Sequence, residues 1–408
     1  MDELSFNWLT GFECSYPRGV DELEKTQHYT YWASDLLKVK SLGVKSLRYG
    51  VPWHRIHTAP GVFDWSWLDG PMQFMRDLEL EPIIDLVHFG TPEWLADGFA
   101  SAGYPVAAAE FARAFATRYP WVRYYTCVNE PYVTTAHCGE LEMWFPYGKG
   151  HGSFVRMLEH VARSVILMTW AVKDTTPNAR FVWVDTGEFH HGGDAPGRAK
   201  AAFINEKRFI AHDLIWGRVT DDHPLRGWLR ENGMSDAAIA WFAENGVQPD
   251  ILGLDYYIQS EMLHKSGGAK IAPEGVRVGI AEVVRQYYRR YGVPIMITET
   301  DRHDTLEVRL DWLEDLNKEL IGLRREGVPM VGCCWWPAVD HIDWDTCLTE
   351  QNENINPVGL YQLVREQDGR LSRVETALTH RFREVVAATT SATVPAVAER
   401  ESTPLHAN

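Results

Sequence analysis

The stretch Val293-Pro294-Ile295-Met296-Ile297-Thr298-Glu299 is an apolar, β-branched run that stops at a single glutamate. Apolar residues at helical spacing precede it over 281–291 and follow it over 306–325. A short Ile-rich run between two helices is typical of a buried strand in a parallel sheet, because parallel strands need long crossover connections. The stretch therefore predicts a strand followed by a helix, with Glu299 at the carboxyl end of the strand.

The same alternation of strand and helix recurs along the chain. We expect further strands at 8–12, 46–51, 82–87, 124–128, 180–184, 251–257 and 330–336. Helical spacing predicts helices at 31–42, 67–78, 107–119 and 154–172, two or three shorter helices within 199–246, and a closing helix at 376–388. This pattern predicts an α/β fold: a single-domain (β/α)8 TIM barrel over 1–388, followed by a mobile C-terminal tail over 389–408. The alternative, a doubly wound dinucleotide-binding sheet, is disfavoured because no Gly-x-Gly-x-x-Gly follows the first strand.

The net charge, the start of the chain and the cysteines restrict the binding partners and the cellular location that we expect. The formal net charge of −16, without a long basic run, argues against nucleic acid and anionic membrane partners. The start of the chain, Met1-Asp2-Glu3-Leu4, lacks the basic region of a secretory signal, so we expect a cytoplasmic location. The six cysteines form no Cys-x-x-Cys pair and no Cys/His spacing matches a zinc site. We therefore expect reduced thiols, no metal and no cofactor; composition does not indicate the oligomeric state.

Two glutamates end apolar runs on different expected strands. Glu130 closes the run that begins at Tyr124, as Glu299 closes its own. A carboxylate at the mouth of a buried strand is costly to keep unless it has a role, and in a barrel all strand ends meet on one rim. Two such carboxylates suggest the acid/base and nucleophile pair of a glycosidase. The alternative is that each is a salt-bridged acid at a strand end.

The sequence resembles a known family at this rim. The segments similar to family 1 glycoside hydrolases, the β-glucosidase family, are Leu47-Arg48-Tyr49 with Trp53–Ile56, His88–Leu95, Thr126–Pro131, Asp255-Tyr256-Tyr257, Ile297-Thr298-Glu299, and Trp336–Trp344 with Val358–Tyr361. They follow the family's order and span roughly 6–383 in pieces. The resemblance implies a retaining β-glycosidase that hydrolyses a small β-glycoside or oligosaccharide by double displacement.

The resemblance also implies roles for particular residues. Glu299 would be the nucleophile, with Arg48 and Tyr257 beside it, and Glu130 the general acid and later the base. Asn129 would hydrogen-bond the sugar 2-hydroxyl. The other residues expected to bind substrate are His88, Asp255, Trp336, Asp343 and Trp344. Structural interpretations stay open for Arg48 as a clamp on carboxylates, for His88 as a core histidine, for Asp343 as a loop acid and for the tryptophans as cover for the barrel top.

The chain departs from the family pattern at several positions, so the resemblance does not determine the identity of the glycone. Pro17 falls near the family's sugar-binding Gln, and Glu13 and Arg18 are the candidate substitutes for it. Asp343 and Asp255 replace a Glu and an Asn, and Thr300-Asp301 replaces Asn-Gly. The shorter Asp343 leads us to expect that Asp343→Glu shifts preference toward plain glucosides.

Two other functions stay open. A transglycosidase would differ only in the acceptor that resolves the intermediate, and a non-hydrolytic carbohydrate-binding barrel would fit the altered glycone positions. Asp185, His190 and His191 follow the fifth expected strand, and we interpret them as solvated loop residues.

Overall fold

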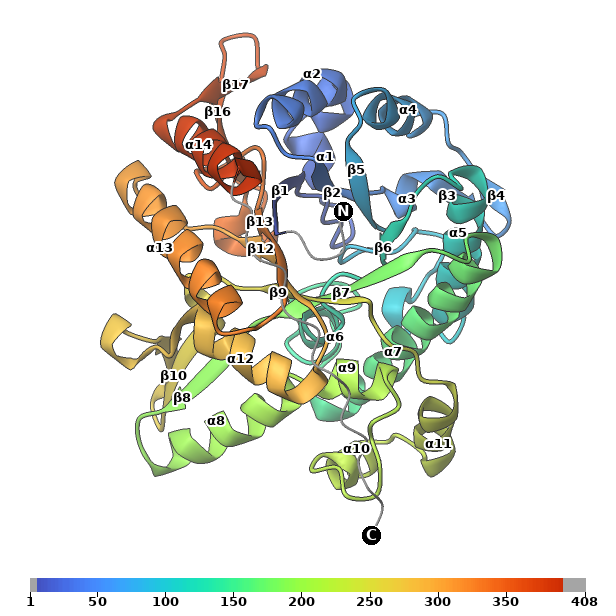
Figure 1. The fold of residues 1–408 in the computed structure, drawn as a ribbon. Helices are drawn as coiled ribbons and strands as arrows, with labels where there is room; N and C mark the ends of the chain where they lie inside the picture. The colour runs from blue at the N-terminus through green and yellow to red at the C-terminus, as the bar shows by residue number, and fades with distance from the viewer. Residues whose placement is uncertain (1–5, 392–408) are drawn as a thin grey trace.

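The computed structural model describes residues 6–391, and eight parallel strands close into a barrel at its centre (Figure 1). The barrel strands are β1 (Asn7–Phe12), β2 (Ser46–Gly50), β5 (Glu81–Asp85), β6 (Tyr124–Thr126), β7 (Arg180–Thr186), β9 (Ile251–Asp255), β12 (Ile295–Thr300) and β13 (Met330–Trp335). Strand β1 pairs in parallel with both β2 and β13, which closes the barrel. The predicted (β/α)8 fold is confirmed, and every expected strand is present with slightly shifted bounds.

Helices surround the strands (Figure 1). The long ones are α2 (His28–Ser41), α4 (Asp69–Asp77), α5 (Tyr104–Arg118), α7 (Gly150–Thr175), α8 (Ala195–Lys207), α11 (Asp236–Asn245), α12 (Gly279–Tyr291), α13 (Leu306–Arg325) and α14 (Ala377–Ser391); the shorter ones are α1 (Glu22–Lys25), α3 (Trp53–Ile56), α6 (Pro131–Gly139), α9 (Ile210–Ile215) and α10 (Arg226–Glu231). Helix α13 has the predicted bounds because the Thr305 hydroxyl accepts the N–H of Val308 at its start. Helix α12 ends at Gly292, whose φ of +69° suits glycine.

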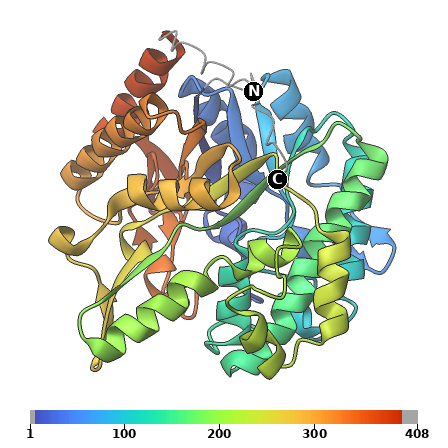
Figure 2. The ribbon, with the colours of Figure 1, turned by 60° about the horizontal axis from the view of Figure 1, so that its bottom comes forward.

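Three expectations need correction. The segment 199–246 holds α9, α10, α11 and most of α8, where two or three helices were expected. A small sheet of β8 (Phe189–Gly192), β10 (Glu261–Lys265) and β11 (Gly268–Ile271) was not predicted; Figure 2 shows it at one edge of the molecule, beside α8. The interpretation of Asp185, His190 and His191 as solvated loop residues is wrong. Asp185 is fully buried on β7, and β8 holds the two histidines against His264 and Glu261.

The interior of the barrel has two zones. Its apolar zone is a cluster of Leu9, Ile83, Tyr124, Val182, Val184, Ile251, Met296, Val331, Cys334 and Trp336, separate from the larger core that the helices cover. Arg48 and Asp255 lie fully buried toward the carboxyl ends of the strands. Buried charged and polar groups are tolerated only where they bond one another. The second zone, at the carboxyl ends of the strands, is therefore where we look for a functional site.

Helix α14 extends to Ser391, so 389–391 of the expected tail are helical, and 392–408 lie outside the described residues. Within 6–391, no helix is both long and apolar enough to cross a membrane. All six cysteines are free thiols, and five of them are buried.

Candidate active site

A cavity of about 360 Å³ opens at the carboxyl ends of the barrel strands and contains both strand-end glutamates. Glu130 reaches it from the end of β6, Tyr257 from the end of β9 and Glu299 from β12. The rest of its lining comes from the end of β7, from α6 and from the segments that follow the barrel strands: Glu13, Phe89, Val133, His137, Trp144, Thr186, Glu188, Gln259, Ser260, Asp301, His303, His341, Trp344, Cys347, Asn356 and Val358. This is the end of a barrel at which catalytic groups gather.

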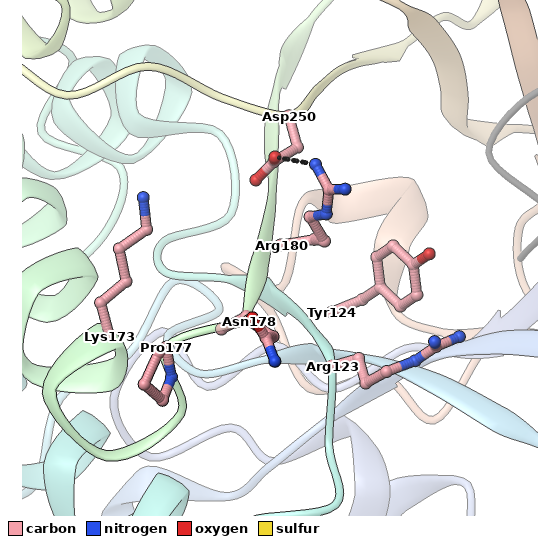
Figure 3. A pocket seen from close by; sticks show the side chains of 8 residues that line it. Arg123, Tyr124, Lys173, Pro177, Asn178, Arg180 and Asp250 are labelled. Atoms are coloured by element: carbon pink, nitrogen blue, oxygen red, sulfur yellow. Dashed lines mark hydrogen bonds and ion pairs between the residues drawn. The ribbon is translucent and has the colours of Figure 1, made fainter.

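A second cavity, of about 510 Å³, lies at the opposite end of the strands (Figure 3). It is formed where β6, β7 and β9 begin, by Arg123, Tyr124, Lys173, Pro177, Asn178, Ala179, Arg180 and Asp250. Arg180 donates to Asp250 at 2.7 Å, and Arg123 pairs with Glu81. Residues at this end of a barrel commonly serve stability, so we assign the first cavity as the candidate active site.

Glu299 has two hydrogen-bond donors at its carboxylate. Arg48 Nη1 donates to Oε1 at 2.5 Å, and the Tyr257 hydroxyl donates to Oε2 at 2.7 Å. Met296 belongs to the interior cluster, so strict alternation along β12 would point residue 299 away from the barrel axis. The pairing of β12 with both neighbours shifts register after Ile297, however, and this irregularity turns Glu299 toward Arg48.

Arg48 holds several of the predicted residues together beneath the cavity. Its Nη2 donates to Asp85 Oδ2 at 2.8 Å and to Asn129 Oδ1 at 3.0 Å. His88 lies against the same pair, with Nδ1 2.9 Å from Asp85 Oδ2 and Nε2 3.2 Å from the Asn129 amide nitrogen. The predicted neighbourhood of Arg48, His88, Asn129 and Glu299 is thus a single buried network, in which Arg48 serves as the central clamp.

Replacing Arg48 with methionine is expected to lower the free energy of unfolding by about 3–5 kcal/mol, because Glu299 and Asp85 would keep buried charges without their partner. Urea unfolding measures the change. Arg113→Met is the matched control, because Arg113 also pairs with an acid, Asp174, but both side chains are exposed. The control should cost about 0–1 kcal/mol. Equal losses in the two variants would contradict a structural role for the buried network.

Glu130 differs from Glu299 in having no hydrogen-bond donor at its carboxyl group within the described part of the chain. Burial raises its pKa well above the ordinary value, and the charges of Asp255, Glu299 and Asp185 raise it further. Burial also raises the pKa of Glu299, but Arg48, His88 and the Tyr257 hydroxyl oppose this effect. A proton shared between the two carboxyl groups therefore goes to Glu130 first.

Two acids that were predicted to bind substrate, Asp343 and Asp255, accept hydrogen bonds from other residues of the protein and lie outside the cavity lining. Asp343 accepts from Lys25 Nζ at 2.8 Å and from the backbone N–H groups of Glu353 and Asn354, and it does not line the cavity. The expectation that Asp343→Glu shifts glycone preference thereby loses its structural basis. Asp255 is also outside the lining; it accepts from the Thr298 hydroxyl, while burial and the Glu299 charge raise its pKa well above the ordinary value.

The two predicted tryptophans lie in different places. Trp344 lines the cavity, and its indole N–H has no hydrogen-bond partner among the described residues. Trp336 is buried below the cavity, where its N–H donates to Glu13 Oε2 at 2.9 Å and Arg48 lies over its ring. Of the two suggested substitutes for the family's Gln, Glu13 lines the cavity, whereas Arg18 donates to the carbonyls of Glu93 and Ala96.

Several lining residues were not predicted as site residues. Asp301 was noted only as a departure from the family pattern, and His341, His303 and Glu188 were not considered as ligands of a substrate. Asp301 and His303 follow the predicted nucleophile by two and four positions, so closeness to Glu299 along the chain was a usable signal. His341 and Glu188 carry no local signal, because the loops after β13 and β7 bring them to the rim.

Known proteins resemble this chain in sequence. A family model described as β-galactosidase (glycoside hydrolase family 42) matches residues 23–135. β-Glucosidase A of Thermotoga maritima is 23% identical over 370 residues, which cover 78% of this chain and 78% of that protein. The 1,4-β-D-glucan glucohydrolase of Thermotoga neapolitana is 22% identical over 366 residues, which cover 78% of this chain and 82% of that protein.

Solved structures resemble it in fold. A family 1 β-glucosidase from Thermotoga maritima superposes with a TM-score of 0.78 at 16% identity, covering 94% of this chain and 98% of that one. A β-glucosidase from the same organism, solved in complex with deoxynojirimycin, superposes equally well. These comparisons confirm the barrel and the resemblance stated from the motifs. The chain is a sequence relative of β-glucosidases and has the fold of the family 1 glycoside hydrolases.

Proposed function

We propose that the chain is a retaining β-glycosidase that hydrolyses a small β-glycoside or oligosaccharide by double displacement. The observation that supports this most directly is that two carboxyl groups in one cavity differ in their hydrogen-bond donors and in their pKa values. Glu299 receives hydrogen bonds from Arg48 and Tyr257, whereas Glu130 receives none from residues 6–391 and has the more strongly raised pKa. Pairs of carboxyl groups whose surroundings separate their pKa values divide into a nucleophile and an acid.

In the first step, a Glu299 carboxylate oxygen attacks the anomeric carbon while the bond from that carbon to the leaving oxygen breaks. Glu130 gives its proton to the leaving oxygen. Arg48 keeps the attacking group ionised and fixed, since it contacts Glu299 from the buried side. The product of this step is a glycosyl ester on Glu299 and a free aglycone.

In the second step, Glu130 is a carboxylate and accepts a proton from water as the water oxygen attacks the anomeric carbon. The ester bond to Glu299 breaks, which restores both groups. Two inversions give net retention. Asn129 is the proposed partner of the 2-hydroxyl, and its side chain is held for this role between Arg48 and His88.

The proposal includes no metal or cofactor, because side chains perform both the displacement and the proton transfers. It keeps the expectation of a cytoplasmic protein. It also includes no nucleic acid or membrane partner, because the net charge of −16 argues against both.

Two measurements test the proposal. Incubation with a 2-deoxy-2-fluoro-β-glycosyl fluoride should attach one glycosyl group to the peptide that contains Glu299, as read by mass spectrometry. Proton NMR of a cleaved aryl β-glycoside should show the β-anomer of the sugar as the first product. A first product with the α-configuration would rule out retention. Sugar binding without either cleavage or labelling would favour the non-hydrolytic barrel, and glycosides formed from an added acceptor would identify a transglycosidase.

The pH dependence of kcat/KM should be bell-shaped, because activity requires a protonated Glu130 and an ionised Glu299. The alkaline limb is expected well above the ordinary glutamate pKa of about 4.3, since burial and the neighbouring carboxylates raise the pKa of Glu130. A pH profile with an aryl glycoside measures it. The Glu130→Ala variant, assayed with a leaving group that needs no proton, should lose the alkaline limb. A limb that persists in this variant would assign the titration to another group.

A further inference from the structure

The position of Glu130 depends on its backbone, because its carboxyl group receives no hydrogen bond from residues 6–391. Its φ of +42° lies in the left-handed region, where a residue with a side chain stays only if the surrounding contacts enforce it. The next residue, Pro131, favours an extended conformation at position 130 instead. Contacts from elsewhere in the fold must therefore hold this part of the backbone.

Regular sheet bonding does not extend to Glu130. The pairing of β6 with β7 ends at Tyr125 and Phe181, well before the glutamate. Farther along the two segments, the N–H of Glu130 donates to the carbonyl of Val184 at 3.1 Å. The carboxyl end of β7 therefore lies beside the backbone of Glu130.

Asp185, the next residue of β7, binds the backbone that follows Glu130. Its Oδ2 accepts from the N–H of Tyr132 at 2.8 Å, and the N–H of Val133 also bonds to the carboxyl group. Both N–H groups belong to the first turn of α6, the helix that begins directly after Glu130. Its Oδ1 accepts from the N–H of Thr186 at 2.9 Å, which orients the carboxyl group on β7. Strand β7 thus contacts the chain both at Glu130 and immediately after it.

Asp185 is a costly residue to keep at this place. It is fully buried, and burial raises its pKa to about 8 although the backbone N–H groups oppose the rise. A carboxyl group can accept from N–H groups in either protonation state, so these contacts do not require its charge. Asp185 does not line the cavity, unlike Glu130. A buried carboxyl group outside the cavity, bonded to the start of α6, indicates a role that is exerted through Glu130.

We propose that Asp185 is a positioning residue for the general acid: it fixes the start of α6 and so holds the Glu130 carboxyl group at the leaving oxygen of the glycoside. The inference rests on the proposed glycosidase function and adds a residue to its acid-catalysis step. Glu299 is held separately, by Arg48 and Tyr257. Loss of the Asp185 contacts should therefore slow proton transfer to the leaving group more than it slows nucleophilic attack.

A comparison of two leaving groups tests the inference. The full-length wild-type chain and Asp185→Asn are assayed for kcat/KM with a phenyl β-glycoside and with a 2,4-dinitrophenyl β-glycoside, whose leaving group needs no proton. In the variant an amide nitrogen replaces one accepting oxygen, so a backbone contact is lost. The value for the phenyl glycoside should fall at least about tenfold more than the value for the dinitrophenyl glycoside, within the roughly 10²–10⁴-fold that acid catalysis contributes. An equal fall for both would overturn the inference.

Asp340→Asn is the matched control. Asp340 is also fully buried and also accepts from backbone N–H groups, those of Gly359 at 2.8 Å and Leu363 at 2.9 Å, but it lies in the segment that follows β13. Its replacement should lower kcat/KM for the two glycosides by similar factors, whatever it does to stability. A dependence on the leaving group as large as that of Asp185→Asn would mean that any loosening of the rim produces the effect, and would overturn the assignment.

A double variant distinguishes an effect through Glu130 from an independent one. In Glu130→Ala the proton donor is already missing, so adding Asp185→Asn should not change the ratio of kcat/KM between the phenyl and dinitrophenyl glycosides any further. An additional fall of this ratio in the double variant would show that Asp185 acts independently of Glu130, and would overturn the positioning role.

Failure of the inference and failure of the proposed function give different results. If the wild-type chain cleaves both glycosides and Asp185→Asn keeps the same ratio of kcat/KM, the inference alone is removed. If the wild-type chain cleaves neither glycoside, the proposed function is removed and the positioning role falls with it.

Discussion

Replacing Glu299 with alanine is expected to lower kcat/KM for aryl β-glycosides by roughly 10⁴–10⁶-fold, the scale seen when a nucleophile is removed from a hydrolase. The loss is large because, among the acids from 6–391 that line the cavity, Glu299 is the one ion-paired with an arginine, and it also accepts from the Tyr257 hydroxyl. The release of a chromogenic aglycone measures the rate. The fold should survive, because Arg48 retains Asp85 and Asn129 as partners.

A second acid in the same cavity provides the control. Glu188→Ala removes a carboxylate that lines the cavity but contacts His190 instead of Arg48. It should change kcat/KM far less than Glu299→Ala, with similar unfolding curves for the two variants. Comparable losses would mean that the acidity of the cavity, and not a particular nucleophile, carries the activity. An active Glu299→Ala variant would contradict the proposed mechanism.

Replacing Glu130 with alanine is expected to slow the cleavage of substrates to an extent that depends on their leaving groups. For a poor leaving group the rate should fall by about 10²–10⁴-fold, because the leaving oxygen no longer receives a proton. For 2,4-dinitrophenolate, which needs no proton, formation of the glycosyl-enzyme should be nearly unaffected, so that a burst of phenolate precedes slow turnover. Stopped-flow absorbance measures the burst.

Azide tests the roles of the two glutamates on opposite faces of the sugar. In Glu130→Ala, azide can enter the space of the missing carboxylate and attack the glycosyl-enzyme without a general base, which should give a β-glycosyl azide. In Glu299→Ala, azide would replace the nucleophile and should give the α-glycosyl azide. NMR of the products distinguishes them. Azides of the same configuration from both variants would contradict the assignment of acid/base and nucleophile.

Local patterns in the sequence were sufficient to predict the barrel and the two glutamates. Ile295-Met296-Ile297 has no polar alternation because β12 is covered by helices on one side and by the barrel interior on the other. The glutamates stand out because each interrupts such a run at its end. Both signals depend on neighbours in the chain, so no tertiary information was needed.

The surroundings of the sugar could not be predicted in the same way. The resemblance assigned Asp343 to the substrate, but Lys25, 318 positions away, takes its carboxylate. Asp301 and Glu13 line the same cavity although they are far apart in the sequence, because they follow β12 and β1, which both end at the same rim of the closed barrel. The register shift on β12 is likewise a property of strand pairing and not of the strand alone.

By itself, the sequence determined the fold and the two strand-end carboxyl groups, because strand and helix periodicity and the cost of a charge at the end of a buried strand are local effects. Only the tertiary structure decided which carboxylate pairs with Arg48 and which acids are neutralised outside the cavity. These outcomes depend on contacts between residues that are distant in the chain, and barrel closure alone brings those residues within hydrogen-bonding range.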